Sequence, residues 1–136
     1  MACPWFCPTR PLEDGRWAVP PRVPLIEPWE GECRARSEAI TPDGQTIRKS
    51  CNSGYARGSC EHFVEGRGDA VRFHVQTSAD GALRILYSYE RECWPIDHGA
   101  VEYHVGTQRA ACDDALLQAQ VEAFAQAWRR RAGAQA

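Results

Sequence analysis

Long apolar runs, lysine and closely spaced cysteine pairs are scarce or absent in this sequence of 136 residues. No apolar run approaches the roughly 20 residues that a membrane-spanning helix needs, so we expect no membrane association. Residues 1–8 lack the basic segment followed by a long apolar one that marks a secretory signal. We therefore expect a small soluble protein that stays in the cytoplasm, where stable disulfides are rare.

A strong positive field is also missing from the chain. Lys49 is the single lysine and the net charge is −2, whereas nucleic-acid-binding domains usually carry a basic patch. The one concentrated basic run, residues 129–131, ends a predicted helix, where arginines complement the negative end of the helix dipole. No Gly-rich phosphate loop, Ser-His-Asp order or paired-carboxylate motif stands out. These absences predict no nucleic-acid partner, and they make catalysis the less favoured kind of function.

What the sequence does contain is an unusual number of cysteines for a cytoplasmic protein. There are seven, and an odd number cannot be completely paired in internal disulfides. Metal ligation is the commonest remaining reason for a cytoplasmic chain to carry so many thiols. Five of the seven lie in the first half of the chain: Cys3, Cys7, Cys33, Cys51 and Cys60.

The first half of the chain predicts little regular structure. Seven of the nine prolines lie at or before Pro28, yet large apolar side chains accompany them, so we expect this stretch to be ordered, extended and packed. A turn at 42–44 predicts a short hairpin between residues 33–40 and 45–51. Such a chain cannot easily offset its ordering entropy through burial alone. We therefore predict a coil-rich lobe over residues 1–68 that a metal centre stabilises.

The second half has clear periodicity. Residues 71–90 alternate between apolar and polar side chains around a turn at 78–81, which predicts a β-hairpin. A third strand is predicted near Val101 and Tyr103, after a loop at Trp94 and Pro95. A helix is predicted to open at residues 113–114, with an apolar stripe of Leu117, Val121, Phe124 and Trp128.

These patterns together predict one α+β domain spanning residues 1–136. The metal-stabilised lobe would pack on a small three-stranded antiparallel sheet with one C-terminal helix, over residues 69–132.

The predicted ligand set takes one cysteine from each irregular segment: Cys3, Cys33, Cys51 and Cys60. The last two bracket a loop with glycines near both ends, and glycine lets backbone amides turn toward the sulfur atoms. Cys7 is the alternative to Cys3, and His62 is the alternative to one of the cysteines. An apolar shell would limit access of solvent to the centre, and its predicted members are Trp5, Phe6, Tyr55 and Phe63.

The spacing of the cysteines also bears on the metal. Structural zinc is usually bound through close pairs such as Cys-x2-Cys, whereas the closest pair here is Cys3 and Cys7. Dispersed ligands are compatible with a [4Fe–4S] cluster, whose larger cage can gather distant loops. The favoured hypothesis is therefore an iron–sulfur protein with a protein partner, in electron transfer, redox sensing or an accessory role. The alternative is a zinc-stabilised interaction module without catalytic activity, with aromatic anchors near Trp29 or Trp94.

A third hypothesis is a thiol enzyme that uses Cys93 and His98. Asp97 lies beside this histidine, so a thiol, a carboxylate and an imidazole are close in sequence. Catalytic Cys–His pairs are normally brought together by folding rather than by local sequence. We therefore interpret Asp97 and His98 as a turn into the third strand, and Cys93 and Cys112 as buried thiols without a metal.

Overall fold

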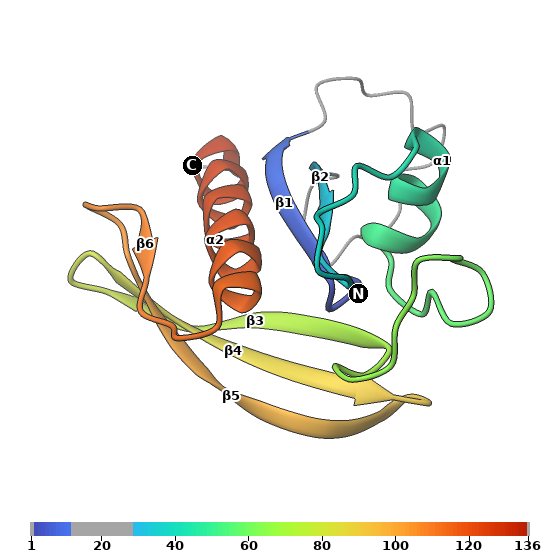
Figure 1. Cartoon of the computed structure of the whole chain (residues 1–136). Coiled ribbons are helices and arrows are strands. Elements are labelled where there is room, and N and C mark those ends of the chain that lie inside the picture. Colours follow the sequence, from blue (N-terminus) through green and yellow to red (C-terminus); the bar gives the residue numbers. More distant parts are fainter. Residues whose placement is uncertain (1, 12–28, 136) are drawn as a thin grey trace.

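The computed structural model describes residues 2–11 and 29–135, which form two antiparallel sheets and one long helix (Figure 1). The helix and the smaller sheet stand side by side above one face of the larger sheet. Most of the proline-rich stretch, residues 12–28, lies outside the described residues, and so does the prediction that it is ordered and packed.

The larger sheet confirms the predicted hairpin. Its strand order is β3-β4-β5-β6, and every neighbouring pair is antiparallel. Asp80 and Gly81 form the turn between the first two strands with φ angles of 54° and 75°, as expected for a two-residue hairpin turn. The four strands are β3 (Ala70–Ala79), β4 (Ala82–Arg91), β5 (Trp94–His104) and β6 (Arg109–Ala110).

The prediction of a three-stranded sheet is wrong, because this sheet has four strands and a second sheet has two. Strand β6 has only two residues, too few for a periodic signal in the sequence. The predicted loop at Trp94 and Pro95 is also wrong. Strand β5 starts at Trp94 after a two-residue turn, and Pro95 is accommodated at a register shift against β4.

The smaller sheet replaces the hairpin predicted for residues 33–51. Strands β1 (Phe6–Pro11) and β2 (Trp29–Cys33) pair antiparallel, whereas Cys33 forms an isolated bridge with Ile40. The chain then turns helical in α1 (Gly44–Thr46) and a π-helical turn, η1 (Ile47–Cys51). Asp43 accounts for this difference, because its carboxylate accepts the Thr46 N–H at 2.7 Å and caps the helical segment.

Helix α2 (Ala115–Gln135) begins close to the predicted position. Asp114 caps it, accepting the N–H groups of Leu116 and Leu117 at 3.0 and 3.2 Å. The buried face is wider than the predicted stripe, because α2 contacts β1 as well as β5 and β6. Its buried hydrophobic residues are Leu116, Leu117, Val121, Ala123, Phe124, Ala125 and Ala127.

The hydrophobic core lies between this helix and the side of the larger sheet that faces it. Leu83, Ile85 and Tyr103 are among its most buried members. The rings of Phe73 and Phe124 join strand β3 to the helix, with centroids 5.5 Å apart. Within the described residues, no helix has both the length and the apolar character needed to span a membrane.

Candidate metal centre

Four cysteines from four separate segments line one small cavity. Cys3 precedes β1, Cys33 ends β2, Cys51 ends η1, and Cys60 lies in the loop that follows. These are the four residues of the predicted ligand set. Cys7 does not line the cavity, although it is buried in β1.

Backbone hydrogen bonds fix the positions of these cysteines. The N–H of Cys3 donates to the carbonyl of Cys51 at 3.0 Å, which joins the N-terminal segment to η1. Cys33 and Ile40 exchange two backbone hydrogen bonds, at 2.7 and 3.0 Å. The N–H of Cys60 donates to the carbonyl of Ala56 at 2.8 Å, inside a tight turn. Each thiol therefore projects from a backbone held by secondary structure or by a turn.

The loop between Cys51 and Cys60 has the glycine-dependent geometry that the sequence predicts. Gly54 and Gly58 have φ angles of 76° and 80°, and Tyr55 between them is also left-handed at 56°. The Tyr55 hydroxyl donates to Glu90 and accepts the backbone N–H of Cys93 at 3.0 Å. The prediction that Tyr55 belongs to the apolar shell is therefore wrong, because its side chain reaches toward the larger sheet.

The other three predicted shell residues, Trp5, Phe6 and Phe63, do line the cavity. The indole N–H of Trp5 donates to the carbonyl of Val64 at 2.7 Å and so ties the two sides of the wall together. The cavity has a volume of about 10 Å³, which is room for about one water-sized sphere. The four cysteines therefore line one narrow apolar space.

Burial and mutual proximity keep two of these thiols protonated in the absence of a cation. Burial raises the pKa of Cys3 to about 12, against a smaller lowering effect of the Trp5 amide, and a negative charge on Cys33 raises it further. Burial likewise raises the pKa of Cys51, and charges on Cys3 and Cys33 add to that effect. A bound metal cation reverses this balance, because coordination deprotonates a thiol.

The two alternative ligands have different positions. His62 lines the same cavity with 27% of its side chain exposed, and its Nε2 lies 3.6 Å from a Glu61 carboxylate oxygen. Cys7 follows Phe6 in β1, and successive side chains of a strand point to opposite faces. Since Phe6 lines the cavity, Cys7 projects away from it. The structure therefore brings His62, but not Cys7, to the four cysteines.

The sequence patterns do not indicate two buried amide side chains that support the cavity. Asn52 accepts the N–H of Trp29 at 2.9 Å and donates to the carbonyls of Trp29 and Ile47 at 2.8 and 3.1 Å. Gln120 of α2 donates to the carbonyls of Cys3 and Phe6 at 2.9 and 2.7 Å. A glutamine within an apolar helix face was the one signal that could have identified the second of them.

Cys93 and His98 are not within reach of each other. Cys93 is exposed in the turn before β5, so its predicted burial is wrong, and Cys112 is half-buried. His98 lies further along the chain, within β5 rather than in a turn. Strand rise places it roughly 15 Å from Cys93, beyond hydrogen-bond reach.

The two predicted aromatic anchors differ in exposure. Trp29 is 4% exposed and belongs to the core, whereas Trp94 is 76% exposed. Only the second could contact a partner.

Within the described residues, no group of three or more His, Cys, Asp or Glu side chains is arranged around a single metal ion. Comparisons of the chain with protein-family models, with curated proteins and with solved structures found no match. Since no known protein indicates a function, a functional proposal has to start from the cysteine cavity itself.

Proposed function

We propose that this protein binds a [4Fe–4S] cluster through Cys3, Cys33, Cys51 and Cys60. The observation that carries the proposal is that these four thiols, which come from four separate segments of the sequence, line one cavity. Five of the seven cysteines lie within residues 1–68, and four of these five line the cavity. The fifth, Cys7, lies in β1 next to Phe6, which does line it. Four cysteines are also the usual ligand set of such a cluster.

The chemistry of the walls supports a cysteine-ligated centre. Trp5, Phe6 and Phe63 supply an apolar surround, which limits solvent access. The backbone amides of Trp5 and Phe6 lower the pKa of the Cys3 thiol against the effect of burial, and amide groups near a ligating sulfur tune the potential of a cluster. The cavity of about 10 Å³ holds one water-sized sphere, so the eight-atom cluster requires the segments that carry the four cysteines to move apart as it is inserted.

Four protein ligands leave no iron open to a substrate. The function that follows is electron transfer, redox sensing or an accessory role in a complex, rather than activation of a bound substrate. Of the four cysteines, Cys60 is the half-buried one, whereas the other three are buried. A redox partner would therefore approach on the side of the loop that carries Cys60.

The test is anaerobic purification followed by absorption spectroscopy and metal analysis. We expect a brown protein with broad absorption near about 400 nm, and iron and sulfide at about four each per chain. A colourless protein that carries one zinc would instead assign the cavity to a structural zinc site. A colourless, metal-free protein that stays folded in chelator would contradict both metal assignments.

Single substitutions then identify the ligands. Cys3→Ala, Cys33→Ala, Cys51→Ala and Cys60→Ala should each remove most of the iron and the colour. Cys7→Ala is the matched control, because it deletes a buried thiol from the same N-terminal segment outside the cavity. Equal loss of iron in Cys7→Ala and Cys3→Ala would contradict the assigned ligand set.

A further inference from the structure

The proposed cluster can enter the cysteine cavity only if a wall of the cavity moves, because the space of about 10 Å³ is far smaller than the cluster. The walls come from the N-terminal segment, from the end of β2, from η1 and from the loop that follows η1. We expect the wall that is held least firmly by the rest of the protein to be the one that opens.

Three of the cysteines belong to one connected framework. Cys33 pairs with Phe6 in the β1–β2 sheet, and the N–H of Cys3 donates to the carbonyl of Cys51 at 3.0 Å. Gln120 of α2 donates to the carbonyls of Cys3 and Phe6, so the long helix is part of the same framework. All three cysteines are buried. Movement of any of these three walls would therefore break hydrogen bonds between elements that are packed together.

The fourth wall is formed by residues 58–66, which we call the Cys60 loop. It contributes Cys60, His62 and Phe63 to the cavity, yet none of its residues is buried. It begins and ends with a glycine at positive φ, 80° at Gly58 and 142° at Gly66. Glycine loses the most conformational freedom on folding and adopts other backbone angles readily, so both ends of the loop can change conformation.

The backbone hydrogen bonds of the Cys60 loop are local. The amides of Ser59 and Cys60 donate to the carbonyl of Ala56 at 2.9 and 2.8 Å, and the amide of Phe63 donates to the carbonyl of Cys60 at 3.2 Å. Arg57, just before the loop, lies over the Phe63 ring at 5.1 Å from its centroid. Among the described residues, no backbone–backbone bond joins this loop to a strand or to a helix. Few buried contacts and local bonds are typical of a segment that opens easily.

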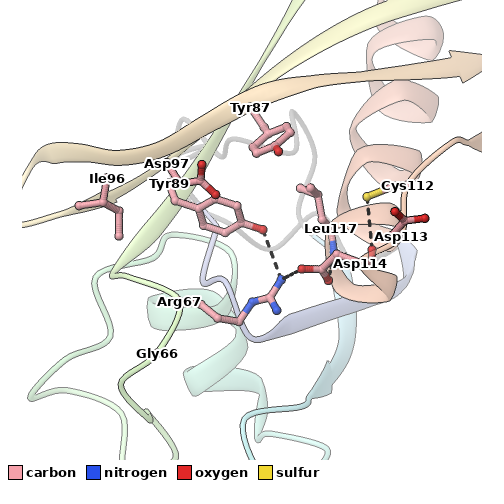
Figure 2. A pocket seen from close by; sticks show the side chains of 10 residues that line it. All are labelled: Gly66, Arg67, Tyr87, Tyr89, Ile96, Asp97, Cys112, Asp113, Asp114 and Leu117. Atoms are coloured by element: carbon pink, nitrogen blue, oxygen red, sulfur yellow. Dashed lines mark hydrogen bonds and ion pairs between the residues drawn. The ribbon is translucent and has the colours of Figure 1, made fainter.

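The residues on either side of the Cys60 loop are anchored. The N–H of Tyr55 donates to the carbonyl of Asp69 at 2.8 Å, next to the start of β3. Arg67, which directly follows the loop, donates to the Tyr89 hydroxyl at 3.3 Å and pairs with Asp114 at the start of α2 (Figure 2). The loop can therefore move between two fixed points without detaching its neighbours.

Trp5 joins the Cys60 loop to the framework. Its indole N–H donates to the carbonyl of Val64 at 2.7 Å, and a Cβ at Gly66 would lie 3.5 Å from its ring. An ion pair between Glu65 and Arg91 links the loop to the end of β4, but both side chains are about half exposed, at 50% and 45%. Such exposed pairs contribute little to stability. The hydrogen bond from the indole is therefore the main polar contact that keeps the loop closed.

We propose that the Cys60 loop is a lid, which opens to admit the metal centre and then closes with Cys60 as the last ligand. The identity of what enters rests on the proposed function, whereas the opening itself belongs to the metal-free protein. Cys3, Cys33 and Cys51 bind the centre first, because their positions are fixed. When the lid closes, the sulfur of Cys60 bonds to the metal and its proton passes to the solvent. Trp5 is the latch.

Hydrogen exchange of the reduced, metal-free protein, followed by NMR, tests whether the lid opens. The amides of Ser59 and Cys60 and the indole N–H of Trp5 should share one low protection factor, because one opening exposes all three. The amides of Cys3 and Cys33 should exchange more slowly. Protection at Ser59 and Cys60 that equals protection at Cys33 would overturn the proposal.

The variant Trp5→Phe keeps a ring but removes the donor of the latch. Exchange at Ser59 and Cys60 should become about fivefold faster, as loss of one hydrogen bond implies, with no change at Cys33. Local fraying of the turn at Ala56 would not respond to this substitution. Trp94→Phe is the matched control, because Trp94 is 76% exposed in β5, and it should leave these rates unchanged. An equal effect of the two variants would contradict the latch.

Uptake of iron tests whether the lid is the entrance. The metal-free proteins are given ferrous iron and sulfide under reducing, anaerobic conditions, and the absorption near about 400 nm is followed over time. Trp5→Phe should take up iron about fivefold faster than the wild type, in proportion to its open population, and Trp94→Phe should not. An unchanged rate in Trp5→Phe would overturn entry through the lid. Absence of uptake in every protein would contradict the proposed function, whereas the exchange data decide separately whether the loop opens.

Discussion

Asn52 illustrates how single residues hold the walls of the cysteine cavity. Its side chain is fully buried and satisfies three backbone groups, which belong to β2 and to the first residue of η1. It directly follows Cys51, so its hydrogen bonds also fix the backbone next to a proposed ligand. At this scale, the positions of the thiols depend on side chains that are not themselves ligands.

Replacing Asn52 with alanine should therefore destabilise the protein markedly. One amide and two carbonyls would lose a buried partner, which corresponds to about 2–3 kcal/mol in the free energy of unfolding. Urea denaturation measures this difference. Gln45→Ala is the control, because Gln45 is exposed in α1, and its stability should change by less than about 0.5 kcal/mol. Similar stability of the two variants would show that the Asn52 contacts contribute little.

Gly31 allows β1 and β2 to approach closely. A Cβ at this glycine would lie 2.0 Å from the carbonyl oxygen of Cys7, a backbone atom that cannot move away without breaking the pairing. Gly31→Ala should cost more than about 3 kcal/mol or prevent folding, which a thermal melt and the soluble yield would reveal. Gly44→Ala, where a Cβ meets nothing within 4 Å, should fold normally. A Gly31→Ala protein that melts like the wild type would contradict the close approach.

That Cys3, Cys33, Cys51 and Cys60 lie around one cavity agrees with their grouping in the sequence analysis, whereas the groups that position them could not be predicted. Cysteine is a rare residue with few roles, so its clustering in an irregular segment carries information by itself. The contacts of Asn52 and Gln120 join residues that are far apart in the sequence. Nothing in local spacing indicates such pairs, because they form only when distant elements pack together.

At the scale of elements, the start of α2 shows how one carboxylate serves two purposes. Asp114 caps the helix and pairs with Arg67, which in turn lies over Trp5 next to the N-terminal strand. The start of the helix is therefore tied to the loop before β3. Loss of this cap would affect the attachment of the helix as well as its first turn.

Asp114→Ala should lower the free energy of unfolding by about 1–2 kcal/mol, the usual cost of losing a helix N-cap. Asp113→Ala removes a neighbouring, exposed carboxylate that caps nothing within the described residues, and it should change stability little. Chemical denaturation compares the two variants. Hydrogen exchange at Leu116 and Leu117 should accelerate only in the first, since their amides donate to Asp114. Equal exchange rates in the two variants would contradict the capping role.

Elements with a long periodic pattern were predictable, and elements defined by pairing partners were not. The β3–β4 hairpin and α2 are long elements with a regular apolar pattern. Strand β6 is too short to have a pattern, and β1 ends at Pro11 but pairs with a strand that begins only at Trp29. The Asp43 cap and the turn at 42–44 use the same residue types, so the sequence alone could not separate a helical start from a hairpin.

At the scale of the whole molecule, buried carboxylates make stability depend on pH. Burial raises the pKa of Asp69, but hydrogen bonds from the Glu92 amide and from Arg57 outweigh it and lower the pKa below its ordinary value. The pKa of Glu90 is lowered in the same way, since hydrogen bonds from Arg72 and Tyr55 outweigh burial. Both carboxylates therefore bind protons less readily in the folded state than in the unfolded state.

Stability should accordingly fall in acid. The contribution of these groups is complete above their unfolded pKa values of about 4, and it is lost as the pH falls through the lower folded values. Urea denaturation between pH 7 and pH 3 measures this slope. Asp69→Asn should be less stable at pH 7 and should show a shallower slope, whereas Asp80→Asn should retain the wild-type slope. An unchanged slope in Asp69→Asn would mean that other groups cause the acid sensitivity.

The hydrogen bonds from Gln120 to Cys3 and Phe6 also determine when the cysteine cavity can be completed during synthesis. All four of its cysteines have been translated once Cys60 is added, but the backbone of Cys3 is fixed by a helix from the end of the chain. The segment between Cys60 and Gln120 takes about 3–12 s to add at the usual rate of translation. Since Gln120 supports the backbone of Cys3, we expect insertion of the proposed cluster to follow the synthesis of α2.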